Sequence, residues 1–179
     1  KRSDVLGEIS ILYRTIAVAG THGKTTTSSI IAHILKVSKK QGACFIGGVT
    51  SNYESNLILG KGKLSVMEAD EFDQSLLKLN PDTIILTSMD SDHLDVYKSE
   101  ENVQKNYIEF TKKIKNKRKL IVEESIHYLF QNNLSYGFSD FNDLQIFNII
   151  INNGYYDFDV KYKNEVFKDF SLKMPGKHN

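Results

Sequence analysis

The chain has 179 residues, of which 40% are hydrophobic and 25% are charged, and its formal net charge is +1. A chain of this length and composition can bury one core, so we expect one globular domain with room for a small subdomain. The small net charge gives no electrostatic reason to expect a nucleic acid or a membrane surface as partner. Cys44 is the only cysteine, which excludes an internal disulfide and fits the reducing cytoplasm.

The first part of the chain alternates short apolar runs with segments of helical periodicity. Residues 16–19 form a continuous apolar run, which indicates a strand buried on both faces. Residues 25–41 have apolar side chains at helical spacing, and Gly42 is the expected end of that helix. Residues 49–56 are polar and predict a loop. The other predicted strands are 43–48, 64–68, 82–88 and 119–123, and the other predicted helices are 72–79, 100–115 and 125–131.

This alternation predicts an α/β fold, with a mainly parallel sheet flanked by helices. The pattern changes near residue 134, after which β-rich segments follow one another with only turn residues between them. We therefore expect residues 134–174 to form a small antiparallel β extension near the C-terminus rather than an independent domain.

Residues 20–26, GTHGKTT, lie between a predicted strand and a predicted helix. The glycines allow backbone N–H groups to face an anion, and the start of the following helix adds partial positive charge. Lys24 can lie along the phosphates, and the Thr25 hydroxyl can bind Mg²⁺. The first glycine is Gly20, because Val18 occupies the place of the first glycine in the common eight-residue form. The motif predicts a phosphate loop, and the alternative is a glycine turn that only caps the helix.

Residues 67–73, MEADEFD, directly follow another predicted strand. A carboxylate at the carboxyl end of a strand, beside a phosphate loop, is where an α/β nucleotide site holds its metal. We predict Glu68 as this ligand, with Asp70 and Glu71 opening the next helix or supporting the ligand. The alternative is a solvated acidic turn.

Residues 89–97, MDSDHLDVY, place three aspartates and His93 at the same expected edge of the sheet. His93 could bind a second Mg²⁺ or contact a phosphate. Because Mg²⁺ prefers oxygen ligands, a histidine ligand is unusual on chemistry alone. A histidine that only braces its loop is the alternative.

These motifs in this order resemble the central ATPase domain of the Mur ligases. The resemblance rests on AVAGTHGKTTT (17–27), EADEFDQSLLKLNPDTIILTSMDSDHLDVY (68–97) and PGKHN (175–179), and residues 134–174 are its least diagnostic part. Three features favour the member that joins L-alanine to UDP-N-acetylmuramate. They are the histidine in GTHGKTT, the tetrad EADE and the motif DHLDVY. They favour it over the later-acting members and over folylpolyglutamate synthetase.

The resemblance implies an ATP site and two Mg²⁺ ions. Lys24 would hold the ATP phosphates, Thr25 and Glu68 would bind one Mg²⁺, and His93 would serve the second. The residues that would bind ATP are Gly20, Thr21, His22, Gly23, Lys24, Thr25, Thr26, His178 and Asn179. Asn52 and Asn56 lie where contacts with the muramyl substrate are expected.

The resemblance also implies a three-domain enzyme. Residues 1–14 would be the tail of an N-terminal UDP-binding domain, residues 15–179 the central domain, and the C-terminal domain would be absent, so this piece alone would be inactive. The implied reaction transfers the γ-phosphoryl group of ATP to a carboxylate, and the amine of L-alanine attacks the resulting acyl phosphate. The alternatives are a ligase that recycles murein tripeptide, a nucleotide-binding module without chemistry and a simple P-loop NTPase.

Overall fold

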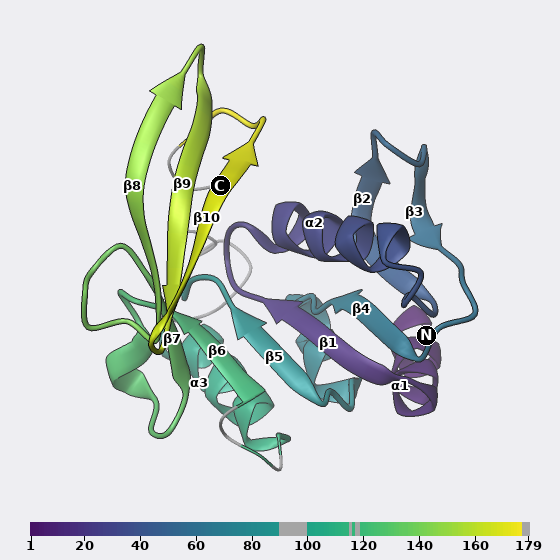
Figure 1. Cartoon of the computed structure of the whole chain (residues 1–179). Helices are drawn as coiled ribbons and strands as arrows, with labels where there is room; N and C mark the ends of the chain where they lie inside the picture. Colours follow the sequence, from purple (N-terminus) through teal and green to yellow (C-terminus); the bar gives the residue numbers. More distant parts are fainter. Residues whose placement is uncertain (90–99, 115, 117–118, 177–179) are drawn as a thin grey trace.

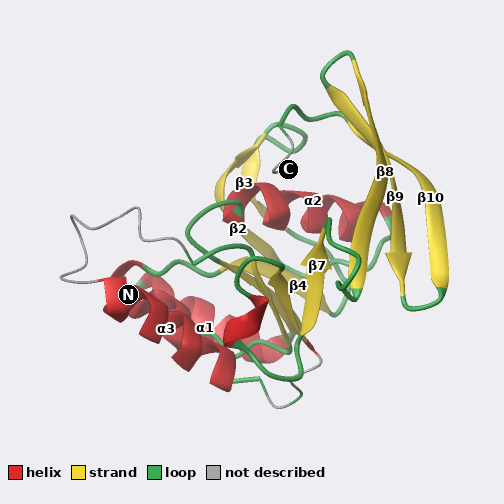
Figure 2. Cartoon of the chain, turned by 90° about the vertical axis from the view of Figure 1, so that its left-hand side faces the viewer, coloured by secondary structure: helices red, strands yellow, loops and turns green. Residues whose placement is uncertain are grey.

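The computed structural model describes residues 1–89, 100–114, 116 and 119–176, which build one mixed sheet with helices on both faces (Figures 1 and 2). The helices are α1 (Arg2–Leu12), α2 (Lys24–Val37) and α3 (Glu100–Lys112), with the 3₁₀ helices η1 (Phe72–Lys78) and η3 (His127–Leu129). The strands are β1 (Arg14–Ala19), β2 (Cys44–Thr50), β3 (Ser55–Ile58), β4 (Leu64–Glu68), β5 (Thr83–Leu86), β6 (Leu120–Glu123), β7 (Leu134–Gly137), β8 (Leu144–Asn152), β9 (Tyr155–Tyr162) and β10 (Glu165–Leu172). Within this described part, no helix is both long and apolar enough to cross a membrane.

The centre of the sheet is parallel, as the alternation of strands and helices predicted. The strand order is β10-β9-β8-β7-β6-β5-β1-β4-β2-β3. β1 pairs in parallel with β4 on one side and with β5 on the other. Its apolar residues are buried on both faces, because Ala17 and Ala19 pack into one core cluster and Val18 into the other. The prediction of a doubly buried strand at residues 16–19 is therefore confirmed.

The two core clusters lie on opposite faces of the sheet (Figure 2). On one face, α2 packs Ala32 and Leu35 against strand residues that include Ile46. The other face is covered by α1, α3 and η1, where Tyr107 and Phe110 of α3 are fully buried. The apolar stripe of the helix predicted at 100–115 is thus the face that packs on the sheet.

Two predicted boundaries in the first part are wrong. α2 ends at Val37, and the chain leaves it at Lys39 with φ 56°, so Gly42 does not close the helix. The Lys40 N–H donates to the Leu35 carbonyl at 2.9 Å and satisfies the helix end without a glycine. The residues 49–56 are not one loop, because Val49 and Thr50 end β2, residues 51–54 form the turn of the antiparallel β2–β3 hairpin, and Ser55 and Asn56 begin β3.

Two further segments have a local structure that the sequence did not indicate. Residues 2–12 form the helix α1, for which the sequence analysis predicted no element, and this helix buries Gly7 and Ser10 and packs Leu6 and Ile9 against the core. The helix predicted at 72–79 is the 3₁₀ helix η1. Leu76 of η1 is fully buried, so this short element is anchored in the core.

The antiparallel extension is present but begins later than residue 134. β7 pairs in parallel with β6, and β8 pairs in parallel with β7. Antiparallel pairing begins only between β8 and β9 and continues to β10, in a long ribbon (Figure 1). The four-residue strand β7 carries no pattern that distinguishes parallel from antiparallel pairing, which is why the boundary was wrong.

Replacement of Phe110 by alanine tests the packing of α3 on the sheet. The ring is fully buried, so we expect the variant to lose about 3–5 kcal/mol of unfolding free energy. Urea denaturation followed by circular dichroism measures this loss. The matched control is Glu109→Ala on the exposed side of the same helix, which should change stability by less than about 0.5 kcal/mol. Equal losses in the two variants would contradict the packing described here.

Candidate functional site

The loop of residues 20–23 connects β1 to α2 at the carboxyl edge of the parallel strands (Figure 1). Because β1 lies between β4 and β5, the ends of both neighbours flank this loop. The parallel register places Glu68, the last residue of β4, opposite Val18. Lys24, the first residue of α2, lies at the same edge as Glu68. The structure thus brings together two of the three residues that the sequence nominated for catalysis.

Two glycines give the loop its path. Gly20 has φ 137°, and a Cβ there would lie 2.2 Å from Thr87 Oγ1, so no side chain fits. Gly23 is the N-cap of α2 and has φ 77°, in the left-handed region that glycine adopts without strain. The loop therefore turns tightly against the end of β5 before α2 begins.

Residues after β5 brace the loop. The Thr87 hydroxyl donates to the Ala19 carbonyl at 3.1 Å and also to the His22 carbonyl. The His22 N–H donates to Ser88 Oγ at 2.9 Å, and the Thr21 N–H to the Ser88 carbonyl at 3.4 Å. Sequence analysis missed both residues. Their position at the end of the strand predicted at 82–88 was a signal that the sequence offered. The sequence did not show that this strand is the neighbour of β1.

Glu68 is surrounded by hydrogen-bond donors. Its Oε1 accepts from the Thr25 hydroxyl at 2.9 Å. Its Oε2 accepts from the Gly47 N–H at 2.7 Å and from the Ser28 hydroxyl at 3.3 Å. The carboxylate therefore joins β4 to the first turns of α2 and to β2. Ser28 lies one turn after Thr25, and this helical spacing could have indicated it.

The geometry of Thr25 and Glu68 fits the predicted magnesium site. Mg²⁺ binds oxygen octahedrally at about 2.0–2.1 Å, so neighbouring ligands lie about 2.9 Å apart. Thr25 Oγ1 and Glu68 Oε1 are 2.9 Å apart. Among the described residues no group of three or more His, Cys, Asp or Glu could hold a metal. Two protein oxygens suit Mg²⁺, which usually completes its shell with water and phosphate oxygens.

Lys24 pairs with groups of the protein itself. Its ammonium group donates to the Gly20 carbonyl at 2.6 Å and to the Thr21 carbonyl at 3.3 Å. It also contacts both carboxylate oxygens of Glu71, with a hydrogen bond to Oε1 at 3.2 Å and an ion pair with Oε2 at 3.0 Å. Glu71 therefore contacts the lysine directly, beyond its predicted place at the start of the next helix. Asp70 lies just before the N-cap Glu71 of that helix, and its Oδ1 accepts from the Phe72 N–H at 3.0 Å.

The remaining predicted residues are less closely connected to the loop. Thr26 lies in the first turn of α2 and is partly buried. Asn52, in the β2–β3 turn, and Asn56, on β3, are both exposed. His93, His178 and Asn179 lie outside the described residues, so their predicted roles stay predictions.

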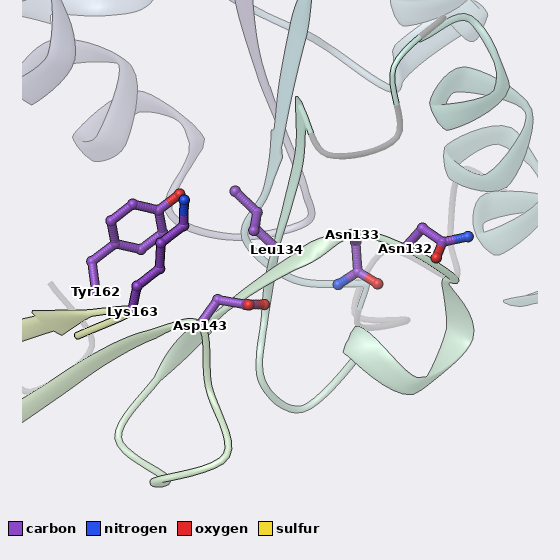
Figure 3. A pocket seen from close by; sticks show the side chains of 6 residues that line it. All are labelled: Asn132, Asn133, Leu134, Asp143, Tyr162 and Lys163. Carbon is purple, nitrogen blue, oxygen red and sulfur yellow. The ribbon is translucent and has the colours of Figure 1, made fainter.

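A pocket of about 320 Å³ lies at the opposite edge of the sheet (Figure 3). Leu134, at the start of β7, and Asp143, just before β8, mark this as the amino edge of the parallel strands. Asp143 has a structural role there, because its carboxylate accepts a hydrogen bond from the Ser135 N–H at 2.9 Å. This pocket is separate from the phosphate loop and contains none of the predicted site residues.

Comparisons with known proteins identify relatives along the whole chain. Residues 18–179 match the family model of the Mur ligase middle domain. The UDP-N-acetylmuramate–L-alanine ligase of Flavobacterium psychrophilum is 48% identical over 180 residues, and that of Flavobacterium johnsoniae is 44% identical. In both comparisons the match covers 100% of this chain and 39% of the relative. The chain thus spans about two fifths of the length of these relatives.

Solved structures share the fold. The UDP-N-acetylmuramate:L-alanyl-γ-D-glutamyl-meso-diaminopimelate ligase from Neisseria meningitides has a TM-score of 0.83 at 21% identity, covering 98% of this chain and 60% of that chain. The UDP-N-acetylmuramate-alanine ligase from Thermotoga maritima has a TM-score of 0.80 at 22% identity, covering 99% of this chain and 40% of that chain. Identities this low show the fold alone. The family-model match and the much closer sequence relatives go further and show that this chain belongs to the Mur ligase family, as a Mur ligase middle domain.

Proposed function

We propose that this chain is the ATP-binding domain of a ligase that joins L-alanine to the carboxylate of UDP-N-acetylmuramate. The names of the relatives at 44–48% identity support this substrate pair. The observation that carries the nucleotide part is the 2.9 Å contact between Thr25 Oγ1 and Glu68 Oε1. It joins the helix that follows the phosphate loop to the carboxyl end of the neighbouring strand, with the spacing of two Mg²⁺ ligands.

The residues of the candidate site have defined roles in this proposal. The ammonium group of Lys24 neutralises the charge of the β- and γ-phosphates, and the start of α2 adds the positive end of its dipole. Thr25 and Glu68 would hold one Mg²⁺, which supplies charge neutralisation and orientation of the phosphates. His93 would serve a second Mg²⁺, His178 and Asn179 would lie beside the adenine, and Asn52 and Asn56 would lie near the muramyl group.

The proposed chemistry needs no side-chain nucleophile. A carboxylate oxygen of UDP-N-acetylmuramate attacks the γ-phosphorus of ATP, ADP leaves, and an acyl phosphate forms. The amine of L-alanine then attacks the acyl carbon, phosphate leaves, and the amine loses a proton. The protein contributes positioning and charge neutralisation, which are the main sources of catalysis in phosphoryl transfer.

A ligase for a murein peptide is the second candidate, because the Neisseria meningitides protein with a TM-score of 0.83 carries such a name. Both candidates share the nucleotide site and differ in the amine that attacks. Sequence identity favours alanine, since the relatives at 41–48% identity are all named for it.

Lys24→Ala tests the phosphate loop. Loss of the charge-assisted contacts to phosphate should cost about 1.5–3 kcal/mol, so the Kd for ATP in the presence of Mg²⁺ should rise about 10- to 100-fold. Isothermal titration calorimetry on the natural polypeptide that carries this chain measures the change. Lys36→Ala, an exposed lysine in the last turn of the same helix, is the control and should leave the Kd unchanged. An unchanged Kd in Lys24→Ala would show that the loop is not the phosphate site.

Glu68→Gln tests the magnesium site. The Mg²⁺ concentration that gives half of the ATP-dependent rise in melting temperature should increase by at least about tenfold, since even groups that only support a metal ligand typically contribute that much. Binding of ATP without Mg²⁺ serves as the internal control and should change little. An unaltered Mg²⁺ titration would exclude Glu68 as a ligand.

Phosphate release tests the ligase activity. In the natural polypeptide it should require UDP-N-acetylmuramate and L-alanine together, because the acyl phosphate forms on the sugar carboxylate and is discharged by the amine. Replacing L-alanine by L-alanyl-γ-D-glutamyl-meso-diaminopimelate distinguishes the second candidate. ATP hydrolysis at the same rate without either substrate would identify a simple NTPase instead.

A further inference from the structure

Lys24, the lysine of the proposed phosphate loop, forms a mostly buried ion pair with Glu71. Lys24 Nζ lies 3.0 Å from Glu71 Oε2, and the two side chains are only 14% and 12% exposed. An ammonium group has three N–H donors. Those of Lys24 point to two loop carbonyls and to Glu71, so a phosphate oxygen can be bound only if one of these contacts is given up.

The carboxylate is the contact that a phosphate would replace. The carbonyls of Gly20 and Thr21 belong to the loop itself, close to Lys24 in the chain, and carry no full charge. Glu71 comes from a different element and carries a full negative charge, which repels the phosphates at short range. Because the pair is mostly buried, solvent screens this attraction and repulsion less than on the surface.

Glu71 is held by a rigid turn. The Gln74 N–H donates to the Glu71 carbonyl at 3.1 Å, and the Leu76 N–H donates to the Asp70 carbonyl at 2.8 Å. Leu76 is fully buried in the core. The backbone that presents the carboxylate is therefore anchored, and the pair can separate only by rotation of the two side chains.

We propose that Glu71 is an internal counter-ion that competes with nucleotide phosphate for Lys24 and thereby lowers nucleotide affinity. This inference rests on the proposed role of the loop in binding ATP. Glu68 and Glu71, three residues apart, then act in opposite directions. Glu68 accepts hydrogen bonds from Thr25, Ser28 and Gly47 at the proposed metal position. Glu71 instead pairs with Lys24 until a phosphate displaces its carboxylate.

Glu71→Gln tests the competition, because glutamine keeps the shape and removes the charge. The Kd for ATP and for ADP, each with Mg²⁺, should fall about five- to thirtyfold, the range expected for coupling between groups in direct contact. The melting temperature of the nucleotide-free protein should fall, since Lys24 loses its charged partner. If Glu71 had only a structural role, Glu71→Gln would instead lower both the stability of the protein and its affinity for nucleotide.

Two further variants complete the design in the natural polypeptide. Asp70→Asn removes a neighbouring charge whose carboxylate accepts a hydrogen bond from the Phe72 N–H, so it should change the Kd less than twofold. Glu71→Asp keeps the charge but withdraws it by one methylene group, and it should give a Kd between those of the wild type and Glu71→Gln. Glu71→Asp also serves as the test if Glu71→Gln does not fold.

The outcomes separate this inference from the proposed function. If Lys24→Ala does not weaken ATP binding, the proposed phosphate site itself is wrong. If Lys24→Ala weakens binding while Glu71→Gln and Glu71→Asp leave the Kd unchanged or raise it, the phosphate site stands and the competition is overturned. A gain in affinity for Asp70→Asn equal to that for Glu71→Gln would also overturn it, because the effect would then be one of general charge.

Discussion

Parallel pairing of β1 with β4 and β5 is the constraint on which the site depends. All three strands run in the same direction, so their carboxyl ends meet at one edge of the sheet. The register that sets Val18 opposite Glu68 brings the carboxylate beside the first turn of α2. Burial of β1 on both faces fixes this register, because a shift of one residue would exchange the two core clusters.

The polar groups of the site pair with one another and with neighbouring backbone groups. Ser88 pairs with N–H groups of the loop, Glu68 accepts three hydrogen bonds, and Lys24 lies against Glu71. The hydrogen bonds of Ser88 tie the loop to the end of β5, and those of Glu68 tie the end of β4 to α2 and β2. Under the proposed function, nucleotide affinity is the difference between the contacts that are gained and those that are given up. The ion pair between Lys24 and Glu71 is the contact that our further inference assigns to this second kind.

The sequence by itself determined the local parts of the site. The apolar run at 16–19, the glycines of GTHGKTT and the Lys24–Thr25 pair predict a buried strand, a turn and a helix start, and the structure has these elements. Each depends on residues that are adjacent in the chain. The sequence also predicted that Glu68 lies at the same edge of the sheet as Lys24, because strands that alternate with helices pair in parallel. Roles that fall on His93, His178 and Asn179 stay predictions.

Only the tertiary structure decided which distant residues meet. Ser88 reaches the loop because β5 is the neighbour of β1, and Gly47 reaches Glu68 because β2 is the neighbour of β4. Glu71 reaches Lys24 because η1 is anchored in the core by Leu76. Strand order and the anchoring of a turn are set by the sum of many weak contacts along the chain. No short stretch of sequence encodes them, which is also why the direction of β7 became clear only in the folded sheet.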